Sequence, residues 1–101
     1  MTFPDQYVTI GDVKTRFWRV GQGGVPLVLL HGLGGTVEDW VGTIMPLARD
    51  REVIAFDLLG CGKTDKPADC TYGPDDMLAH AQGMVEALDL TRFDLDGWSL
   101  G

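Results

Sequence analysis

Two short apolar runs constrain the fold of this chain more than any other feature of its sequence. Residues 25–31 read VPLVLLH and residues 52–56 read EVIAF, and the second run ends at Asp57. A continuous apolar run of this length is typical of a strand that is buried on both faces in a parallel sheet. Parallel strands need a crossover connection, which is commonly a helix. The two runs therefore predict an α/β fold that contains right-handed βαβ units.

Three further segments have the character of strands. Residues 7–10 (YVTI) and 14–20 (KTRFWRV) alternate in polarity around Gly11 and Asp12, which predicts an N-terminal antiparallel hairpin. Residues 92–97 (RFDLDG) read as one more buried-type strand, with a less regular pattern.

The segment between the two apolar runs carries signals for a helix. Thr36, followed three residues later by Asp39, has the pattern of an N-cap box, and apolar residues follow at helical spacing. Proline inside a helix removes a hydrogen bond and clashes with the preceding turn. We therefore expect the helical turn to end near Ile44 and a new one to begin at Pro46.

A second helix is predicted to open at Gly73 and Pro74. Asp75 and Asp76 follow, and their charges suit the positive end of a helix dipole. The apolar residues of this helix form one stripe, which we interpret as core packing: Met77, Leu78, Ala81, Met84, Val85 and Leu88.

The composition is that of one globular domain over residues 1–101, with 45% hydrophobic and 23% charged residues. The formal charge is −7 and the eight basic residues are scattered, which argues against nucleic acid or an anionic membrane as a partner. No targeting segment or membrane-spanning run is visible, so the expected location is the cytoplasm. Cys61 and Cys70 lack histidines at ligand spacing. We expect two reduced thiols and no metal site, while a disulfide between them stays open.

Residues 60–64 (GCGKT) are similar to the end of a phosphate-binding loop. Such a loop needs an earlier glycine and a helix that opens at the Lys-Thr pair. Asp57 occupies the position of the earlier glycine, and Pro67 keeps Lys66 out of the α region. The segment is therefore not predicted to bind a nucleotide.

Residues 32–35 (GLGG) follow the first apolar run, as the glycines of a dinucleotide-binding fingerprint do. Asp57 at the end of the next strand would be available as a ribose ligand. The third glycine of the fingerprint would fall at Val37, whose branched side chain hinders close packing of helix against strand. No dinucleotide, other organic cofactor or metal is therefore expected.

Residues 97–101 (GWSLG) follow a predicted strand and match the Gly-x-Ser-x-Gly pattern of a nucleophile elbow. In an elbow the serine lies on a sharp strand-to-helix turn, where the positions two before and two after it leave no room for side chains. The turn holds the hydroxyl clear of the backbone. This pattern predicts that Ser99 is a nucleophile.

Three motifs together resemble the N-terminal part of an α/β-hydrolase, in the family's order and over nearly the whole chain. HGLGG (31–35) resembles the oxyanion-loop motif, DLLGCGKTDKP (57–67) resembles the loop after the family's fourth strand, and GWSLG resembles its elbow. Among subgroups, the motifs are most similar to small carboxylesterases of the pimeloyl-carrier methyl esterase type and to enol-lactone hydrolases.

The resemblance implies a role for each matching residue. Ser99 would be the nucleophile, and the backbone N–H groups of Leu33 and Leu100 would bind the oxyanion of the tetrahedral intermediate. Trp98 would line the pocket. The other matching residues would shape the oxyanion loop and the elbow: His31, Gly32, Gly34, Gly97 and Gly101.

Other polar residues near these motifs have simpler interpretations. Asp96 as a nucleophile, as in dehalogenase and epoxide-hydrolase relatives, is rejected because its flanking positions, Asp94 and Trp98, do not fit an elbow. As a buried carboxylate, Asp96 would need a partner or a raised pKa. His31 is expected to hydrogen-bond the oxyanion loop, in preference to acting as a base beside Ser99. The remaining candidates are expected to be structural, with His80 solvated on a helix flank and Lys63 and Asp65 shaping their loop.

In this family the triad runs Ser, then Asp or Glu, then His, whereas this sequence stops two residues after Ser99. The resemblance therefore implies a second polypeptide that carries the C-terminal half of the fold. Residues 1–101 alone are expected to be inactive and poorly folded, because the strand at 92–97 is central in the family and would have an open edge. Two hypotheses follow: half of a serine hydrolase for a carboxylic ester or related acyl substrate, or a non-catalytic hydrolase-like binding protein or truncated product. The intact elbow favours the first.

Overall fold

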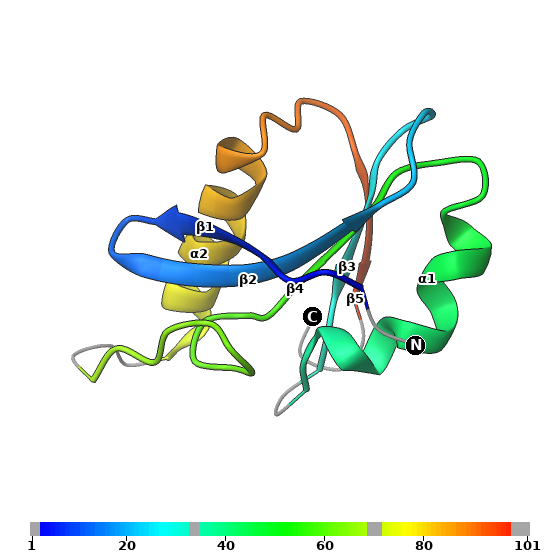
Figure 1. The fold of residues 1–101 in the computed structure, drawn as a ribbon. Helices are drawn as coiled ribbons and strands as arrows, with labels where there is room; N and C mark the ends of the chain where they lie inside the picture. Colours follow the sequence, from blue (N-terminus) through cyan, green and yellow to red (C-terminus); the bar gives the residue numbers. More distant parts are fainter. Residues whose placement is uncertain (1–2, 33–34, 69–71, 98–101) are drawn as a thin grey trace.

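A mixed sheet of five strands organises the chain, with helices against both of its faces (Figure 1). A computed structural model describes residues 3–32, 35–68 and 72–97. The strands lie in the order β1-β2-β4-β3-β5. The elements are β1 Gln6–Ile10, β2 Val13–Val20, β3 Leu27–Leu30, η1 Val37–Trp40, α1 Val41–Leu47, β4 Val53–Phe56, α2 Pro74–Ala87 and β5 Asp94–Gly97. The α/β class and its parallel βαβ units are confirmed.

The predicted hairpin is formed by β1 and β2. The two strands are antiparallel, and their last pair is Ile10 with Val13, which leaves Gly11 and Asp12 as the turn. Gly11 has a φ of 60°, a left-handed conformation that glycine adopts without a steric penalty. The prediction of a two-residue turn at this position is confirmed.

The two apolar runs form the centre of the sheet. β3 and β4 are parallel, with Leu30 opposite Phe56 at their carboxyl ends, and every residue of both strands is buried. β2 pairs with the other side of β4, and β5 lies parallel to β3. The carboxyl ends of β3 and β4 therefore meet at one edge of the sheet, where His31 and Asp57 follow them.

Side chains of the central strands alternate between two hydrophobic layers. One layer lies against η1 and α1 and the other against α2, on opposite sides of the sheet (Figure 1). This burial on both faces explains why the runs are apolar throughout. The first layer contains Trp18, Leu27, Leu29, Val37, Trp40, Ile44, Val53 and Ala55. The second contains Phe17, Val28, Leu30, Ile54, Phe56, Leu58 and Met84.

The predicted N-cap box stands at the start of η1. The Thr36 hydroxyl oxygen accepts a hydrogen bond from the Glu38 N–H at 3.3 Å, and the Asp39 carboxylate accepts one from the Thr36 N–H at 3.3 Å. The capping box lies at the start of a 3-10 turn, η1, and the α-helix α1 follows directly at Val41.

The predicted break near Ile44 is wrong. α1 continues through Pro46 to Leu47, so no new helical turn begins at the proline. The carbonyl that would lose its partner at Pro46 belongs to Gly42, four residues earlier. Gly42 is exposed, and water can therefore replace the missing N–H group.

α2 begins at Pro74 with Gly73 as its N-cap, as predicted, but two of its side chains differ from expectation. Leu78, assigned to the apolar stripe, is 58% exposed. His80, expected to be solvated, is only 5% exposed. It lies three residues after Met77 and four before Met84, on the same face of the helix. Its position on the stripe, rather than its polarity, decides its burial.

β5 differs from the prediction in its burial. The strand exists and pairs with β3, but all four of its residues are exposed. Within the described ranges β5 has a neighbouring strand on one side only, so it is an outer strand of the sheet. Asp96, expected to be a buried carboxylate, is consequently exposed.

Candidate active site

Two of the predicted motifs begin side by side at the edge of the sheet. Gly97, the first glycine of GWSLG, is the partner of Leu30 at the end of β3. His31 and Gly32 follow Leu30 directly and begin HGLGG. The fold thus brings together the beginnings of the elbow and oxyanion-loop sequences. The other predicted site residues lie outside the described residues: Leu33, Gly34, Trp98, Ser99, Leu100 and Gly101.

His31 connects the loops that follow β3 and β4. Its side chain is fully buried, and Nε2 accepts a hydrogen bond from the Leu58 N–H at 2.9 Å. Because the Leu58 N–H can only donate, the ring proton lies on Nδ1, which donates to the Gly32 carbonyl at 2.7 Å. Both ring nitrogens are therefore occupied, and neither is available to accept a proton from a serine.

Asp57 joins three segments at the end of β4. Its fully buried carboxylate accepts hydrogen bonds from the backbone N–H groups of Val37 and Lys63, both at 2.8 Å. The Arg16 guanidinium donates to both carboxylate oxygens, at 2.7 Å from Nε and 3.3 Å from Nη2. Val37 begins η1, so Asp57 and Leu58 hold opposite ends of the segment between β3 and η1.

Polar groups of the loop after Asp57 form hydrogen bonds within the protein. In a phosphate loop, the corresponding groups would bind a nucleotide. The Lys63 N–H donates to the Asp57 carboxylate, and the Thr64 hydroxyl donates to the Asp57 carbonyl at 2.8 Å. Asp65 exchanges hydrogen bonds with Lys14 of β2, at 2.8 Å through its side chain and 3.0 Å through its N–H. Lys63 and Asp65 thus shape the loop, in agreement with the sequence analysis.

Gly62 allows this loop to approach the Asp57 carboxylate. Its φ is 50°, and a Cβ atom at this position would lie 2.3 Å from Oδ2 of Asp57. Both the left-handed backbone and the lack of space therefore require glycine.

A charge cluster around the buried side chains of Arg16 and Asp57 is absent from the sequence predictions. The Arg16 side chain is 2% exposed and is bound by the carboxylates of Asp57, Glu38 and Asp5. Burial alone would lower the pKa of Arg16, but hydrogen bonds to Glu38 and Asp57 raise it. The same contact with Arg16 lowers the pKa of Glu38 to about 2. The available signal was Asp57 itself, since a carboxylate directly after a buried strand needs a positive partner.

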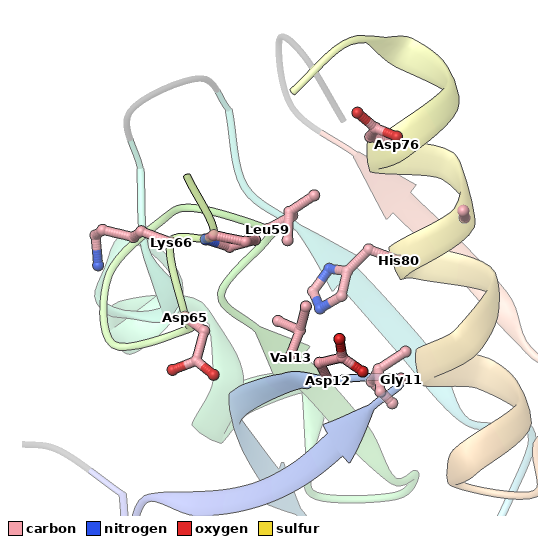
Figure 2. A pocket seen from close by; sticks show the side chains of 11 residues that line it. Gly11, Asp12, Val13, Leu59, Asp65, Lys66, Asp76 and His80 are labelled. Atoms are coloured by element: carbon pink, nitrogen blue, oxygen red, sulfur yellow. The ribbon is translucent and has the colours of Figure 1, made fainter. Parts of the chain in front are cut away.

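A surface groove of about 670 Å³ lies between the β1–β2 turn, the loop at 59–67 and α2. Figure 2 shows the His80 side chain pointing from α2 into this groove, between Leu59 and Val13. His80 Nε2 lies 2.9 Å from the Thr15 hydroxyl, which itself donates to the Val13 carbonyl at 3.2 Å. Burial lowers the pKa of His80 to about 4. None of the predicted site residues that the structure describes lines the groove, so it is separate from the edge where the motifs meet.

Neither a metal site nor a membrane-spanning helix is found in the described part of the chain. Within it, no three or more His, Cys, Asp or Glu side chains are arranged to hold a metal ion. No helix within the same ranges has the length and apolar character needed to cross a membrane. Cys70 lies outside these ranges, so the expectation about the two thiols stays a prediction.

Several known proteins with similar sequences are named as hydrolases. The chain is 43% identical over 97 residues to 2-hydroxy-6-oxo-2,4-heptadienoate hydrolase of Pseudomonas putida. It is 43% identical over 81 residues to 2-hydroxymuconate semialdehyde hydrolase of Pseudomonas sp. strain CF600. These alignments cover 93% and 77% of this chain but 35% and 29% of the relatives. The chain thus spans about a third of the length of the curated relatives it matches.

Comparisons with a solved structure and with a family model give the same result as the comparison of sequences. The structure matches that of CumD, a meta-cleavage product hydrolase from Pseudomonas fluorescens, with a TM-score of 0.89 and 32% identity, over 95% of this chain and 36% of that one. Residues 25–101 match the family model of the α/β hydrolase fold. This match covers most of the sequence and all three of its motifs, and the chain therefore belongs to the α/β-hydrolase fold family.

Proposed function

We propose that this chain is the part of a serine hydrolase that carries its nucleophile, Ser99. The observation that carries the proposal is the pairing of Gly97 with Leu30. It brings the first residue of GWSLG beside the end of β3, where HGLGG begins. Ser99 follows Gly97 by two residues and is the only serine in the sequence. The sequence that carries Ser99 and the sequence that carries Leu33, one of the two proposed oxyanion donors, therefore start at one place.

The proposed reaction is acyl transfer through a covalent intermediate. Ser99 Oγ attacks the carbonyl carbon of the substrate while a base takes its proton. The backbone N–H groups of Leu33 and Leu100 bind the resulting oxyanion. Collapse of the tetrahedral intermediate expels the leaving group with a proton and leaves an acyl-enzyme. Water then attacks the acyl-enzyme, releases the carboxylic acid and restores the Ser99 hydroxyl.

The histidine base of this reaction lies outside residues 1–101. The sequence contains two histidines. His31 uses both ring nitrogens for the loops that follow β3 and β4. His80 lies on α2, bound to Thr15 and away from the edge where the motifs meet. We therefore assign the base and its acidic partner to the remainder of the hydrolase fold, outside residues 1–101.

The substrate is proposed to be a carboxylic ester or a related acyl compound. The names of the two relatives point to one member of this class, a 2-hydroxy-6-oxo-2,4-dienoate, whose 6-oxo carbon is an electrophilic carbonyl. Both this dienoate and a short-chain p-nitrophenyl ester are suitable substrates for assay, because each can be followed by absorbance.

A fluorophosphonate probe tests the nucleophile in the complete hydrolase that contains this chain. The probe should label the peptide that contains Ser99, and Ser99→Ala should abolish both labelling and turnover. Thr91→Ala, an exposed hydroxyl residue outside the motifs, is the matched control and should behave as the wild type. Labelling of another residue, or hydrolysis that survives Ser99→Ala, would contradict the proposal. An assembly that binds substrate without labelling would favour a non-catalytic binding protein.

A further inference from the structure

The groove between the β1–β2 turn, the loop at 59–67 and α2 has a hydrogen-bond acceptor at its inner wall that no described residue uses. The His80 side chain is only 5% exposed and points into this groove (Figure 2). Its Nε2 donates to the Thr15 hydroxyl at 2.9 Å, because that hydroxyl already donates to the Val13 carbonyl. Nδ1 is then an acceptor, and it is buried without a partner among the described residues. A ligand N–H group that reaches Nδ1 would supply the missing hydrogen bond.

The His80 ring is neutral at neutral pH. Burial lowers the pKa of His80 to about 4, so Nδ1 keeps its lone pair. A ligand that binds beside the ring must therefore offer a donor, and a second acceptor at this point would leave Nδ1 unsatisfied.

The charged residues around the groove are mainly acidic. Asp12 of the β1–β2 turn, Asp65 of the loop and Asp76 in the first turn of α2 place one carboxylate on each of its three sides. Lys66 is the only lysine or arginine among the described residues that line the groove. Its Nζ donates to two backbone carbonyls of its own loop, at 2.6 and 3.3 Å. The groove therefore favours a positively charged ligand.

The size and the apolar surface of the groove suit a small molecule. Its volume of about 670 Å³ lies within the range of ligand pockets, about 300–1,000 Å³. Leu59 and Val13 lie on either side of the His80 ring in Figure 2, and Pro67 adds a further apolar surface. The groove adjoins β1, at the opposite end of the sheet from β5. It is therefore distinct from the place where GWSLG and HGLGG begin.

We propose that this groove binds a small organic cation, an amine with an apolar body. The carboxylates attract the ammonium group, one of its N–H groups donates to Nδ1 of His80, and the apolar body packs against Leu59 and Val13. No bond is made or broken at this site. The inference does not rest on the proposed function, because it involves neither Ser99 nor the motif that contains it.

The test uses benzylamine as the probe, with benzyl alcohol and benzoate as neutral and anionic compounds of similar shape. The complete hydrolase that contains this chain is titrated with each compound, and binding is followed by ligand-observed NMR. Benzylamine should bind saturably, and benzyl alcohol should bind at least ~5-fold more weakly, because charge-assisted hydrogen bonds are the stronger ones. Benzoate should bind more weakly still. Equal affinities for the amine and the alcohol would overturn the proposal.

Asp12→Asn locates the binding in the groove. Asparagine keeps the shape of the side chain, suits a turn and removes the charge. Affinity for benzylamine should fall at least ~3-fold. Asp50→Asn, at an exposed aspartate outside the groove, is the matched control and should leave the affinity unchanged. An affinity that Asp12→Asn does not change would overturn the proposal, because the amine would then bind elsewhere.

The contact with His80 has its own spectroscopic readout. In protein labelled with 15N at histidine, a hydrogen bond to the unprotonated Nδ1 should shift its resonance towards that of a protonated ring nitrogen when benzylamine saturates the site. The resonance is assigned by scalar couplings within the ring. A His80 Nδ1 resonance that does not move at saturation would overturn the proposal.

His80→Phe tests the same contact by affinity, since phenylalanine keeps an aromatic ring and lacks the acceptor. Affinity for benzylamine should fall at least ~3-fold. An unchanged affinity would overturn the proposal, and if this variant does not fold, the Nδ1 resonance of the wild type decides. Absence of labelling at Ser99 would overturn the proposed function alone, so the two proposals fail separately.

Discussion

The Nε2 atom of His80 on α2 lies 2.9 Å from the hydroxyl oxygen of Thr15 on β2. The Thr15 hydroxyl donates its own proton to Val13, so it accepts one from His80. Nδ1 is then an acceptor, and it has no hydrogen-bond partner among the described residues. A second proton on this ring would be buried without an acceptor.

This contact predicts acid sensitivity. The pKa of His80 falls from its ordinary value of 6.5 to about 4 because of burial, so the unfolded chain binds the proton more tightly than the folded one. The stability is fully present above pH 6.5 and is lost progressively as the pH falls towards 4, by up to about 3 kcal/mol. Urea unfolding of the complete hydrolase at a series of pH values should show this loss in the wild type and not in His80→Gln. An equal loss in both proteins between pH 6.5 and 4.5 would contradict the prediction.

Alanine substitutions at Gly62 and Gly11 distinguish the cost of backbone strain from the cost of a steric clash. Both have positive φ, 50° and 60°, but a Cβ at Gly62 would meet the Asp57 carboxylate at 2.3 Å, whereas nothing lies within 4 Å at Gly11. Gly11→Ala should cost only the left-handed backbone, about 1–2 kcal/mol. Gly62→Ala should cost ~1–3 kcal/mol more, because the loop must move away from Asp57. Denaturant unfolding of the two variants checks the difference, and equal costs would show that the carboxylate moves aside.

Two helical glycines give opposite predictions for the same substitution. Gly42 on α1 has open space around it, so Gly42→Ala should stabilise the protein by about 1 kcal/mol through helix propensity. At Gly83 on α2 a Cβ would lie 2.3 Å from Cγ2 of Ile10, a stiff branched side chain at the end of β1. Gly83→Ala should therefore destabilise. In an Ile10→Ala background the sign should reverse, and a double-mutant cycle measures the coupling.

Asp94 of β5 and Asp57, which follows β4, should respond very differently to loss of charge. Asp94 pairs with Arg51 at 2.8 Å, but its side chain is 62% exposed. Asp94→Asn should therefore cost less than ~1 kcal/mol. Asp57 is fully buried and accepts four hydrogen bonds, so Asp57→Asn leaves Arg16 partly unpaired and should cost ~3–5 kcal/mol. Comparable losses in the two variants would show that burial does not protect the cluster as described.

Local sequence patterns predicted those parts of the fold that local chemistry determines. The apolar runs of β3 and β4, the turn at Gly11 and the cap at Thr36 each depend on a few neighbouring residues. The family of the chain was also readable, because its motifs are short and contiguous.

The features that sequence analysis missed depend on tertiary contacts. The burial of His80 requires Thr15 from a strand 65 positions away, and the Arg16 cluster draws its carboxylates from three separate segments. Pro46 is tolerated because Gly42, which loses a partner, faces solvent. The exposure of β5 follows from its place at the edge of the described sheet, which no local pattern encodes.

Side chains of β4 alternate between two hydrophobic layers, and this alternation limits where residues can be inserted or deleted. Val53 and Ala55 face η1 and α1, whereas Ile54 and Phe56 face α2. Deleting one residue inside this strand would exchange the two sets, placing Phe56 in a layer that is already filled by Trp18 and Trp40. Insertions and deletions should therefore be tolerated in the connections and rejected within the central strands. Sequence drift in this chain is expected to alter loop lengths long before it alters the spacing of the buried strands.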